Sequence, residues 1–180
     1  MTDYLTNAGA EGQSRCRAYS SQDMKEAKTL IAAFSHRACR LVGEAASAID
    51  AAGGIVGIAH YECFRATNAH SQYAINRLFW DALSHLRHVT KASPDVCEVL
   101  EKLFYLNAMY LVEKHAGDYL EDGYLSGQQL GWVRQHISQL LGELQPDVIA
   151  LTDSWDFCDE ELQSALGRKD GNVYEAYMDW

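Results

Sequence analysis

Apolar residues recur with a helical period over most of the chain. From Ser20 and Ser21, which favour a helix start, apolar side chains return every three or four positions until a stop at Gly53 and Gly54. These side chains are Met24, Ala27, Leu30, Ile31, Phe34, Ala38, Leu41, Val42, Ala45 and Ile49. The pattern predicts a first helix of about 30 residues.

A second stripe predicts another long helix between residues 55 and 92. Its members are Ala59, Cys63, Ala66, His70, Ala74, Leu78, Ala82, Leu86 and Val89. Ser93 and Pro94 restart the chain as a third helix, because proline is favoured at the first helical position, and we expect this helix to end before Gly117.

After a connection over residues 118–127, Ser126 and Gln129 have the spacing of a capping box for a fourth helix. Pro146 opens a fifth helical segment, and shorter helices are expected near residues 159–166 and 172–180. We find no useful run with the period of a strand. The predicted fold class is all-α, an antiparallel bundle of four to five main helices followed by short C-terminal helices.

Composition and charge narrow the function. Residues 1–20 are polar and glycine-containing and predict a flexible N-terminal arm, and residues 21–180 predict one helical domain, since the chain is 48% apolar and long enough for one core. The net charge of -10 repels a phosphate backbone and argues against nucleic acid as a partner. No apolar run reaches the length of a membrane span.

Metal and disulfide chemistry are not indicated. The five cysteines are widely spaced without a Cys-x-x-Cys pair, which fits a reducing compartment. His85 and His88 have a spacing that is common by chance, so we assign no metal ligand.

The tail contains the most distinctive local pattern. Gly167 and Gly171 are expected to take positive φ values and to form an elbow that presents Arg168, Lys169 and Asp170 together.

A last helix should follow this elbow. Asn172 is its expected cap, with Glu175 in capping-box position, and Val173, Tyr177 and Trp180 fall on one face. A solvated turn is the structural interpretation of the elbow, and a ligand contact is the functional one.

Five stretches together resemble the C-terminal helical domain of the peroxisomal acyl-CoA oxidase family. The tail run Leu-Gly-Arg-Lys-Asp-Gly-Asn-Val-Tyr-Glu over residues 166–175 follows an Asp-x-x-Asp-Phe element at residues 153–157. Residues 35–42, 65–73 and 115–120 match further family segments in the same order. Lys169 departs from the family, which has an aromatic residue there.

The resemblance implies an FAD-dependent oxidase that converts fatty acyl-CoA and O2 to trans-2-enoyl-CoA and H2O2, the first step of peroxisomal β-oxidation. In that family this domain serves dimerisation and active-site closure. The catalytic glutamate and the main flavin-binding parts lie upstream, so FAD is expected to be held mainly by domains absent from this chain. We assign no catalytic residue and expect this segment alone to be inactive.

The resemblance also implies partners and a location. A homodimer, or association with the upstream flavin domains, is expected, and the location is the peroxisome, although the chain ends in Met-Asp-Trp and not in a Ser-Lys-Leu signal. The alternative is a stand-alone, non-catalytic helical assembly or binding module derived from such an oxidase.

Seven residues are candidates for cofactor binding or for the dimer face. Arg65 is interpreted either as a salt-bridge partner or as a phosphate contact, and His70 either as a core histidine or as a functional one. The other candidates come from the elbow and the last helix: Arg168, Asp170, Gly171, Asn172 and Tyr174.

Overall fold

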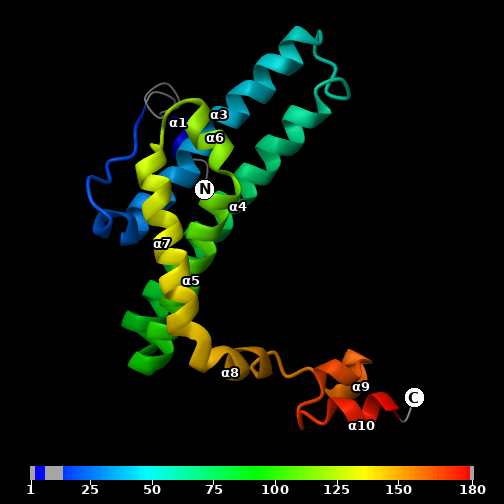
Figure 1. Cartoon of the computed structure of the whole chain (residues 1–180). Coiled ribbons are helices and arrows are strands. Elements are labelled where there is room, and N and C mark those ends of the chain that lie inside the picture. Colours follow the sequence, from blue (N-terminus) through cyan, green and yellow to red (C-terminus); the bar gives the residue numbers. More distant parts are fainter. Residues whose placement is uncertain (1–2, 7–13, 179–180) are drawn as a thin grey trace. The chain divides into compact units, whose positions relative to one another are not determined.

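The computed structural model describes residues 3–6 and 14–178, which form helices and turns without a strand (Figure 1). The predicted all-α fold is confirmed. Contacts divide the chain into two compact units, residues 1–142 and 143–180. The assignment of residues 21–180 to a single domain stays a prediction. None of the described helices is both long and apolar enough to cross a membrane.

The first unit contains the long helices. They are α3 (Ala27–Ala51), α4 (His60–His85), α5 (Pro94–Lys114) and most of α7 (Gly127–Leu144), with the short α1 (Asp3–Thr6) and α6 (Ala116–Glu121). A 3-10 turn at Gln22–Lys25 precedes α3, and a π-helical turn at Leu86–Thr90 follows α4. The largest fully buried apolar side chains include Met24, Leu30, Phe34, Leu41, Phe104, Met109 and Tyr119.

The helices α3 and α4 form an antiparallel hairpin (Figure 1, cyan to green). The predicted stop between them is confirmed: Gly53 and Gly54 have φ values of 65° and 85°, and the Gly54 N–H donates to the Ile49 carbonyl at 2.9 Å. The hairpin's first helix begins at Ala27, later than predicted, because Met24 belongs to the separate 3-10 turn.

The predicted stripe of α4 agrees with the structure in the first half of the helix, where Ala66 is buried and Cys63 is half buried, and is wrong in the second half. The chain makes turns before His60, and the buried positions are Ala66, Ala69, Tyr73, Asn76 and Leu83. Leu78, expected inside, is half exposed. Asn76 occupies the interior because its amide donates to the Gln72 carbonyl and accepts from Asn107. Counting only apolar letters therefore misplaces the buried face in the second half of this helix.

The starts of the helices were predicted more accurately than the buried face of α4. The helix α5 begins at Pro94 as expected. The capping box before α7 is confirmed, since the Ser126 N–H donates to Gln129 Oε1 at 2.8 Å and the Gln129 N–H donates to Ser126 Oγ at 3.2 Å. The expected connection over residues 118–127 instead begins inside α6, where Tyr119 is completely buried.

The first 20 residues differ from the expected unpacked arm where the structure describes them. Tyr4 in α1 is buried and stacks edge-on against Tyr73. Ala18 is also buried, and the Cys16 N–H donates to the Tyr124 carbonyl at 3.0 Å. Flexibility of this segment stays a prediction.

The second unit consists of short helices. They are α8 (Val148–Asp153), α9 (Asp159–Leu162) and α10 (Val173–Met178), with 3-10 turns at Gln145–Asp147 and Ala165–Gly167. The single helix expected over residues 159–166 is interrupted by Gln163, whose φ is 47°. Trp180, assigned to the last helix face, lies outside the described residues.

Candidate functional site

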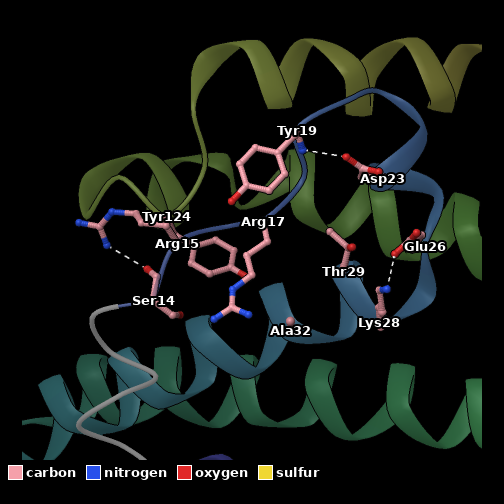
Figure 2. A pocket seen from close by; sticks show the side chains of 10 residues that line it. All are labelled: Ser14, Arg15, Arg17, Tyr19, Asp23, Glu26, Lys28, Thr29, Ala32 and Tyr124. Carbon is pink, nitrogen blue, oxygen red and sulfur yellow. Dashed lines mark hydrogen bonds and ion pairs between the residues drawn. The ribbon is translucent and has the colours of Figure 1, made fainter.

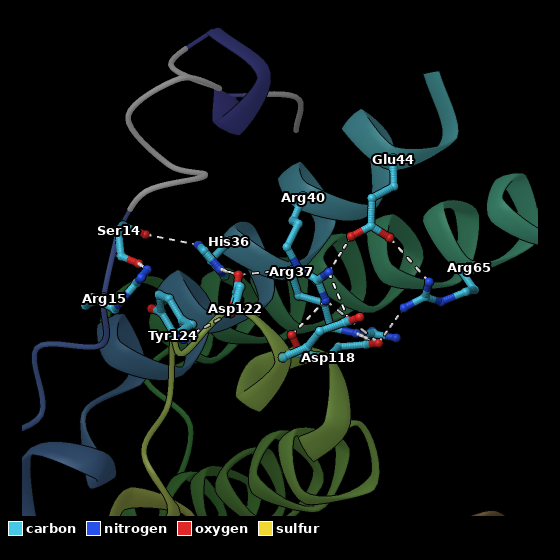
Figure 3. Close-up of polar contacts among 11 residues, drawn as sticks. Ser14, Arg15, His36, Arg37, Arg40, Glu44, Arg65, Asp118, Asp122 and Tyr124 are labelled. Carbon is cyan, nitrogen blue, oxygen red and sulfur yellow. Dashed lines mark hydrogen bonds and ion pairs between the residues drawn. The ribbon is translucent and has the colours of Figure 1, made fainter. Parts of the chain in front are cut away.

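A group of buried and half-buried charges joins α3, α4 and α6. We call it the Asp118 cluster and define it as Arg37, Arg40, Glu44, Arg65 and Asp118 (Figure 3). Arg37 Nε donates to Asp118 Oδ2 and Arg65 Nη2 donates to Asp118 Oδ1, both at 2.7 Å. Arg40 donates to the Asp118 backbone carbonyl at 2.7 Å and pairs with Glu44. One aspartate therefore connects three helices.

The electrostatics of Asp118 favour its charged form. Burial acts to raise the pKa of this carboxyl, but the hydrogen bonds from Arg37 and Arg65 lower it, and the result is a pKa below the ordinary value. For Arg65, burial acts to lower the pKa, but the hydrogen bond that it donates to Asp118, together with the charges of Asp118 and Glu44, raises the pKa above its ordinary value. These groups stabilise one another as ions.

The polar contacts continue from the cluster to His115. Arg37 Nη1 donates to Gln72 Oε1 at 2.8 Å, and the Gln72 amide lies 3.1 Å from His115 Nε2. Burial and the nearby Arg37 charge lower the pKa of His115. The neutral ring is thus favoured, and its unprotonated nitrogen accepts the hydrogen from Gln72.

A second chain of hydrogen bonds lies beside the cluster (Figure 3). Ser14 Oγ lies 3.1 Å from His36 Nδ1, and His36 Nε2 lies 2.6 Å from Asp122 Oδ2. Its composition is that of a hydrolase triad. However, the His36 ring is completely buried and stacked on Tyr124, with centroids 4.1 Å apart, so the chain fixes the segment at Ser14 to α3.

The structure places the candidates Arg65 and His70 in protein contacts. Arg65 bonds to Asp118 and Glu44, which are the carboxylates of its salt-bridge interpretation. His70 is half buried, and its Nδ1 lies 2.7 Å from the hydroxyl of Tyr4. The guanidinium of Arg65 is thus bound by two carboxylates, and cofactor binding by Arg65 or His70 stays a prediction. A place on a dimer face stays a prediction for both.

The elbow in the second unit is built around Asp170. Arg168 Nε donates to Asp170 Oδ1 at 2.9 Å, and the Asn172 N–H donates to the same oxygen at 2.9 Å. The Arg168 side chain, followed by the Asn172 N–H, lowers the pKa of Asp170 to about 2. Gly171 has the expected positive φ, 72°. Arg168 and Asp170, which the elbow was expected to present together, are therefore paired with each other.

Two details of the elbow differ from expectation. Gly167 lies in a 3-10 turn without a positive φ. The side chains of Asn172 and Glu175 are bonded to each other, but the Asn172 N–H goes to Asp170, so the reciprocal capping box does not form. Tyr174 projects into solvent, 86% exposed. Cofactor or dimer contact by these residues stays a prediction.

One face of α4 is apolar and exposed. It carries Tyr61, Phe64, Ile75 and Leu78, spaced as one helical row, and each is at least half exposed. We call this set the α4 row. In the second unit large apolar side chains are also exposed, namely Ile149, Trp155, Phe157, Leu166, Tyr177 and Met178. Large apolar side chains that gather on one exposed face are typical of protein interfaces.

Sequence reasoning missed Asp118, Arg37 and His36 as site residues. A signal was present, because the Ser35-His36-Arg37 triplet interrupts the apolar face of the first helix and all three side chains are buried. Charged residues are rarely buried without partners, so this triplet indicated that an acidic residue from another part of the chain contacts it. Within the described residues, no group of His, Cys, Asp or Glu side chains is arranged to hold a metal ion.

The chain is similar to known proteins over most of its length. A family model described as acyl-CoA oxidase matches residues 26–180. Peroxisomal acyl-coenzyme A oxidase 2 of Oryctolagus cuniculus is 34% identical over 177 residues, which cover 93% of this chain and 25% of the relative. The chain thus spans about a quarter of the length of such relatives.

Solved structures of acyl-CoA oxidases also resemble this chain. Acyl-CoA oxidase 1 of Arabidopsis thaliana superposes with a TM-score of 0.84 at 26% identity and covers 99% of this chain and 27% of its own. Acyl-CoA oxidase-1 of Caenorhabditis elegans, solved in complex with FAD and ATP, gives a TM-score of 0.74 at 31% identity, covering 86% of this chain and 24% of its own.

Proposed function

The chain belongs to the acyl-CoA oxidase family, and we propose that it is the C-terminal helical domain of an FAD-dependent oxidase of fatty acyl-CoA. In this proposal it supports dimerisation and closure of the active site, which other parts of the enzyme build. The whole enzyme would convert fatty acyl-CoA and O2 to trans-2-enoyl-CoA and H2O2 in the peroxisome, the location that the names of its relatives give.

The observation that carries this proposal is the exposed apolar surface on a chain that spans about a quarter of its relatives. Phe64 is 70% exposed and Ile75 60% exposed, although both belong to the long helix α4. Burying such side chains stabilises an assembly by about 25 cal/mol per Å² of apolar area removed from water. A supporting domain that packs on further protein explains why this sequence places them outside.

The short helices of the second unit support the same conclusion. The helices α8 and α10 contain no buried residue, and Trp155 is 74% exposed. A unit of this size buries too little apolar surface to be stable by itself. We infer that this surface is covered by other protein in the working enzyme.

The role of the Asp118 cluster in this proposal is support. Its ion pairs fix α3, α4 and α6 relative to one another and so hold the α4 row on a rigid hairpin. FAD would supply the hydride acceptor in the whole enzyme. Because Arg65 and His70 are engaged by protein groups, we assign flavin binding to parts outside this chain and derive no step through it.

The alternative is a stand-alone, non-catalytic helical assembly module. The same exposed surface would then bind a partner other than flavin domains. The two functions differ in one property. If the chain is an oxidase domain, the oxidase activity of the flavin-containing part depends on it, and if the chain is a stand-alone module, that activity does not.

Complementation tests the proposal. The flavin-containing part of the rabbit relative, ending where this chain's match begins, is mixed with FAD, a fatty acyl-CoA and this chain, and H2O2 is measured. We expect peroxide from the mixture and none from this chain alone.

The matched control replaces this chain with the relative's own C-terminal part. If that part restores peroxide formation and this chain does not, the oxidase function is contradicted and the assembly module is favoured. Peroxide from this chain alone would contradict both.

A further inference from the structure

A non-helical segment, residues 14–21, crosses the first unit before α3 (Figure 2). We call it the strap. Exposure alternates along its middle part: Arg15, Arg17 and Tyr19 are exposed and border an open pocket, whereas Ala18 is buried. A period of two is typical of an extended chain, which presents one side to the protein and the other to water. The backbone of the strap is therefore within reach of the elements beneath it.

The middle of the strap is held by its backbone. The Cys16 N–H donates to the Tyr124 carbonyl at 3.0 Å, and Gln129 Nε2 donates to the Ala18 carbonyl at 2.8 Å. Main-chain bonds of this kind do not depend on the side chains of the strap, and proteins commonly bind extended peptides through them. Ala18 is only 4% exposed, so a small side chain is required at this position.

Both ends of the strap meet a buried histidine. Ser14 Oγ lies 3.1 Å from His36 Nδ1, and His36 Nε2 lies 2.6 Å from Asp122 Oδ2 (Figure 3). Because a carboxylate only accepts hydrogen bonds, His36 carries its proton on Nε2, and its Nδ1 accepts from the Ser14 hydroxyl. At the other end, His136 Nε2 donates to the Ser21 carbonyl at 2.8 Å, and the Ser21 hydroxyl lies 2.9 Å from the same nitrogen.

The groups that contact the strap are fixed by other contacts. We call His36, Tyr124, Gln129 and His136 the strap site. Gln129 Oε1 accepts from the Ser126 N–H at 2.8 Å, which leaves its Nε2 for the strap. The His36 ring is stacked on Tyr124 with centroids 4.1 Å apart. Gln129 and His136 lie about two turns apart on one face of α7. Such preorganisation lowers the cost of binding a peptide.

The core of the first unit does not depend on the strap. Within residues 14–21 only Ala18 is buried. Among the described residues, the next buried side chains on either side are Tyr4 in α1 and Met24 in the 3-10 turn, both outside the strap. On release, the hydrogen bonds of the strap exchange for bonds to water, so their net contribution is modest. Segments with few buried apolar contacts open more easily than the whole fold.

We propose that the strap site is a peptide-binding site and that the strap is its intramolecular ligand, which leaves without unfolding of the helices. The site accepts an extended peptide with hydroxyl side chains at the positions of Ser14 and Ser21 and a small side chain at the position of Ala18. Tethering gives the strap an effective concentration of about millimolar, so it keeps a free peptide out. The proposal is independent of the oxidase role, because its contacts lie within the first unit of this chain.

Displacement of the strap in the full chain tests the proposal. In Ala18→Arg a guanidinium group takes a buried position without a partner, so the strap should leave its site. A fluorescein-labelled peptide with the sequence of residues 14–21 is titrated under reducing conditions, and fluorescence anisotropy is measured. We expect a Kd below about 100 μM for Ala18→Arg and a Kd at least about tenfold higher for the unchanged chain, whose strap competes.

A second substitution, Gln129→Glu in the Ala18→Arg chain, tests the site itself. Glutamate keeps the acceptor of the capping box but lacks the Nε2 donor, so the Kd for the peptide should rise at least about tenfold. The matched control Gln135→Glu adds the same charge at an exposed position of α7 and should leave the Kd unchanged. A peptide of the same composition in scrambled order controls for attraction of a basic peptide to an acidic chain.

Native-state hydrogen exchange tests release of the strap in the unchanged chain. The Cys16 amide is bonded to Tyr124, and the Phe34 amide lies in the buried part of α3. The Cys16 amide should exchange at least about tenfold faster, because it opens with the strap alone. This measurement does not require the Ala18→Arg variant to fold, and thermal melts establish whether that variant does.

Four results would overturn the proposal. They are no binding of the peptide to folded Ala18→Arg up to about 1 mM, equal binding of the scrambled peptide, an unchanged Kd after Gln129→Glu, and equal exchange rates of the Cys16 and Phe34 amides.

Discussion

Where α5 ends the chain turns into α6 and places Asp118 between guanidinium groups from two other helices. The side chain of Asp118 is 16% exposed and that of Arg37 is 4% exposed, so this ion pair is shielded from water. Shielded charges are costly when one partner is removed, since the remaining charge stays buried without compensation. This makes the aspartate a sensitive position for stability.

We expect Asp118→Asn to lower the free energy of unfolding by about 3 kcal/mol, because it leaves Arg37 and Arg65 without their shared carboxylate. Urea denaturation measures this change. The control Glu121→Gln removes a carboxylate of the same helix whose side chain is 66% exposed, and it should cost about 0.5 kcal/mol or less. Equal losses in the two variants would contradict a special role for Asp118.

The polar interior also predicts how stability depends on pH. The pKa of His115 is lowered in the folded state, so its contribution is complete above the unfolded pKa of about 6.5 and is lost as the pH falls toward the folded value. The lowered pKa values of Asp118 and Asp122 act in the same direction at lower pH, since their contributions are lost as the pH falls through the folded values.

We therefore expect the free energy of unfolding to fall between pH 7 and pH 5, and His115→Gln to reduce this slope. Glutamine keeps an acceptor for Gln72 but binds no proton in this range. The measurement is urea denaturation at several pH values. The exposed His85→Gln should leave the slope unchanged, and the same slope in all three proteins would count against His115 as the cause.

At the scale of elements, the α3–α4 hairpin depends on its turn. Gly54 has a φ of 85° with open space where a Cβ would lie, so strain at this position comes from the backbone and not from a clash. Gly57, three residues later, has similar space and no positive φ. The two glycines form a matched pair.

Gly54→Ala should lower the free energy of unfolding by about 1 kcal/mol, the usual cost of a left-handed conformation for alanine. Gly57→Ala should change it by less than about 0.5 kcal/mol. Chemical denaturation compares the two variants. If Gly54→Ala lowers the free energy of unfolding less than Gly57→Ala does, the positive φ of Gly54 is not important for the stability of the hairpin.

The same elements show what the sequence can and cannot predict. Backbone signals that act within a few residues were interpreted correctly: Pro94 starts α5, Ser126 and Gln129 cap α7, and Gly53 and Gly54 end the first helix. The buried face of the second half of α4 was predicted wrongly, because Asn76 becomes a core residue only through Gln72 and Asn107.

The Asp118 cluster escaped prediction for a related physical reason. Its members are far apart in the sequence, and only the packing of three helices brings Arg37, Arg65 and Asp118 together. In contrast, Arg168 and Asp170 are two residues apart, and the local turn that presents them together was expected from the sequence. A single sequence indicates contacts between residues a few positions apart, but it does not indicate which distant residues pair in the fold.

On the scale of the whole molecule, the protein exposes more apolar surface than a self-sufficient domain requires. The α4 row places Phe64 and Ile75 in water on a rigid hairpin, and the second unit exposes Trp155 and Tyr177. Membership in a family whose members are about four times longer gives this surface a physical reason. We expect this exposed apolar surface to drive association of the isolated chain as well.

We expect the isolated chain to self-associate at high concentration and to bind a dye that fluoresces on apolar surfaces. The double variant Phe64→Glu with Ile75→Glu should lower both signals severalfold, because two charges on the α4 row oppose its burial. Sedimentation velocity and dye fluorescence measure the two effects. The control Gln135→Glu with Ser138→Glu adds the same charge at exposed polar positions of α7, so it separates loss of apolar contact from simple repulsion. If the control lowers the signals as much as the double variant, association arises from the net charge of the chain and the α4 row is not the interface.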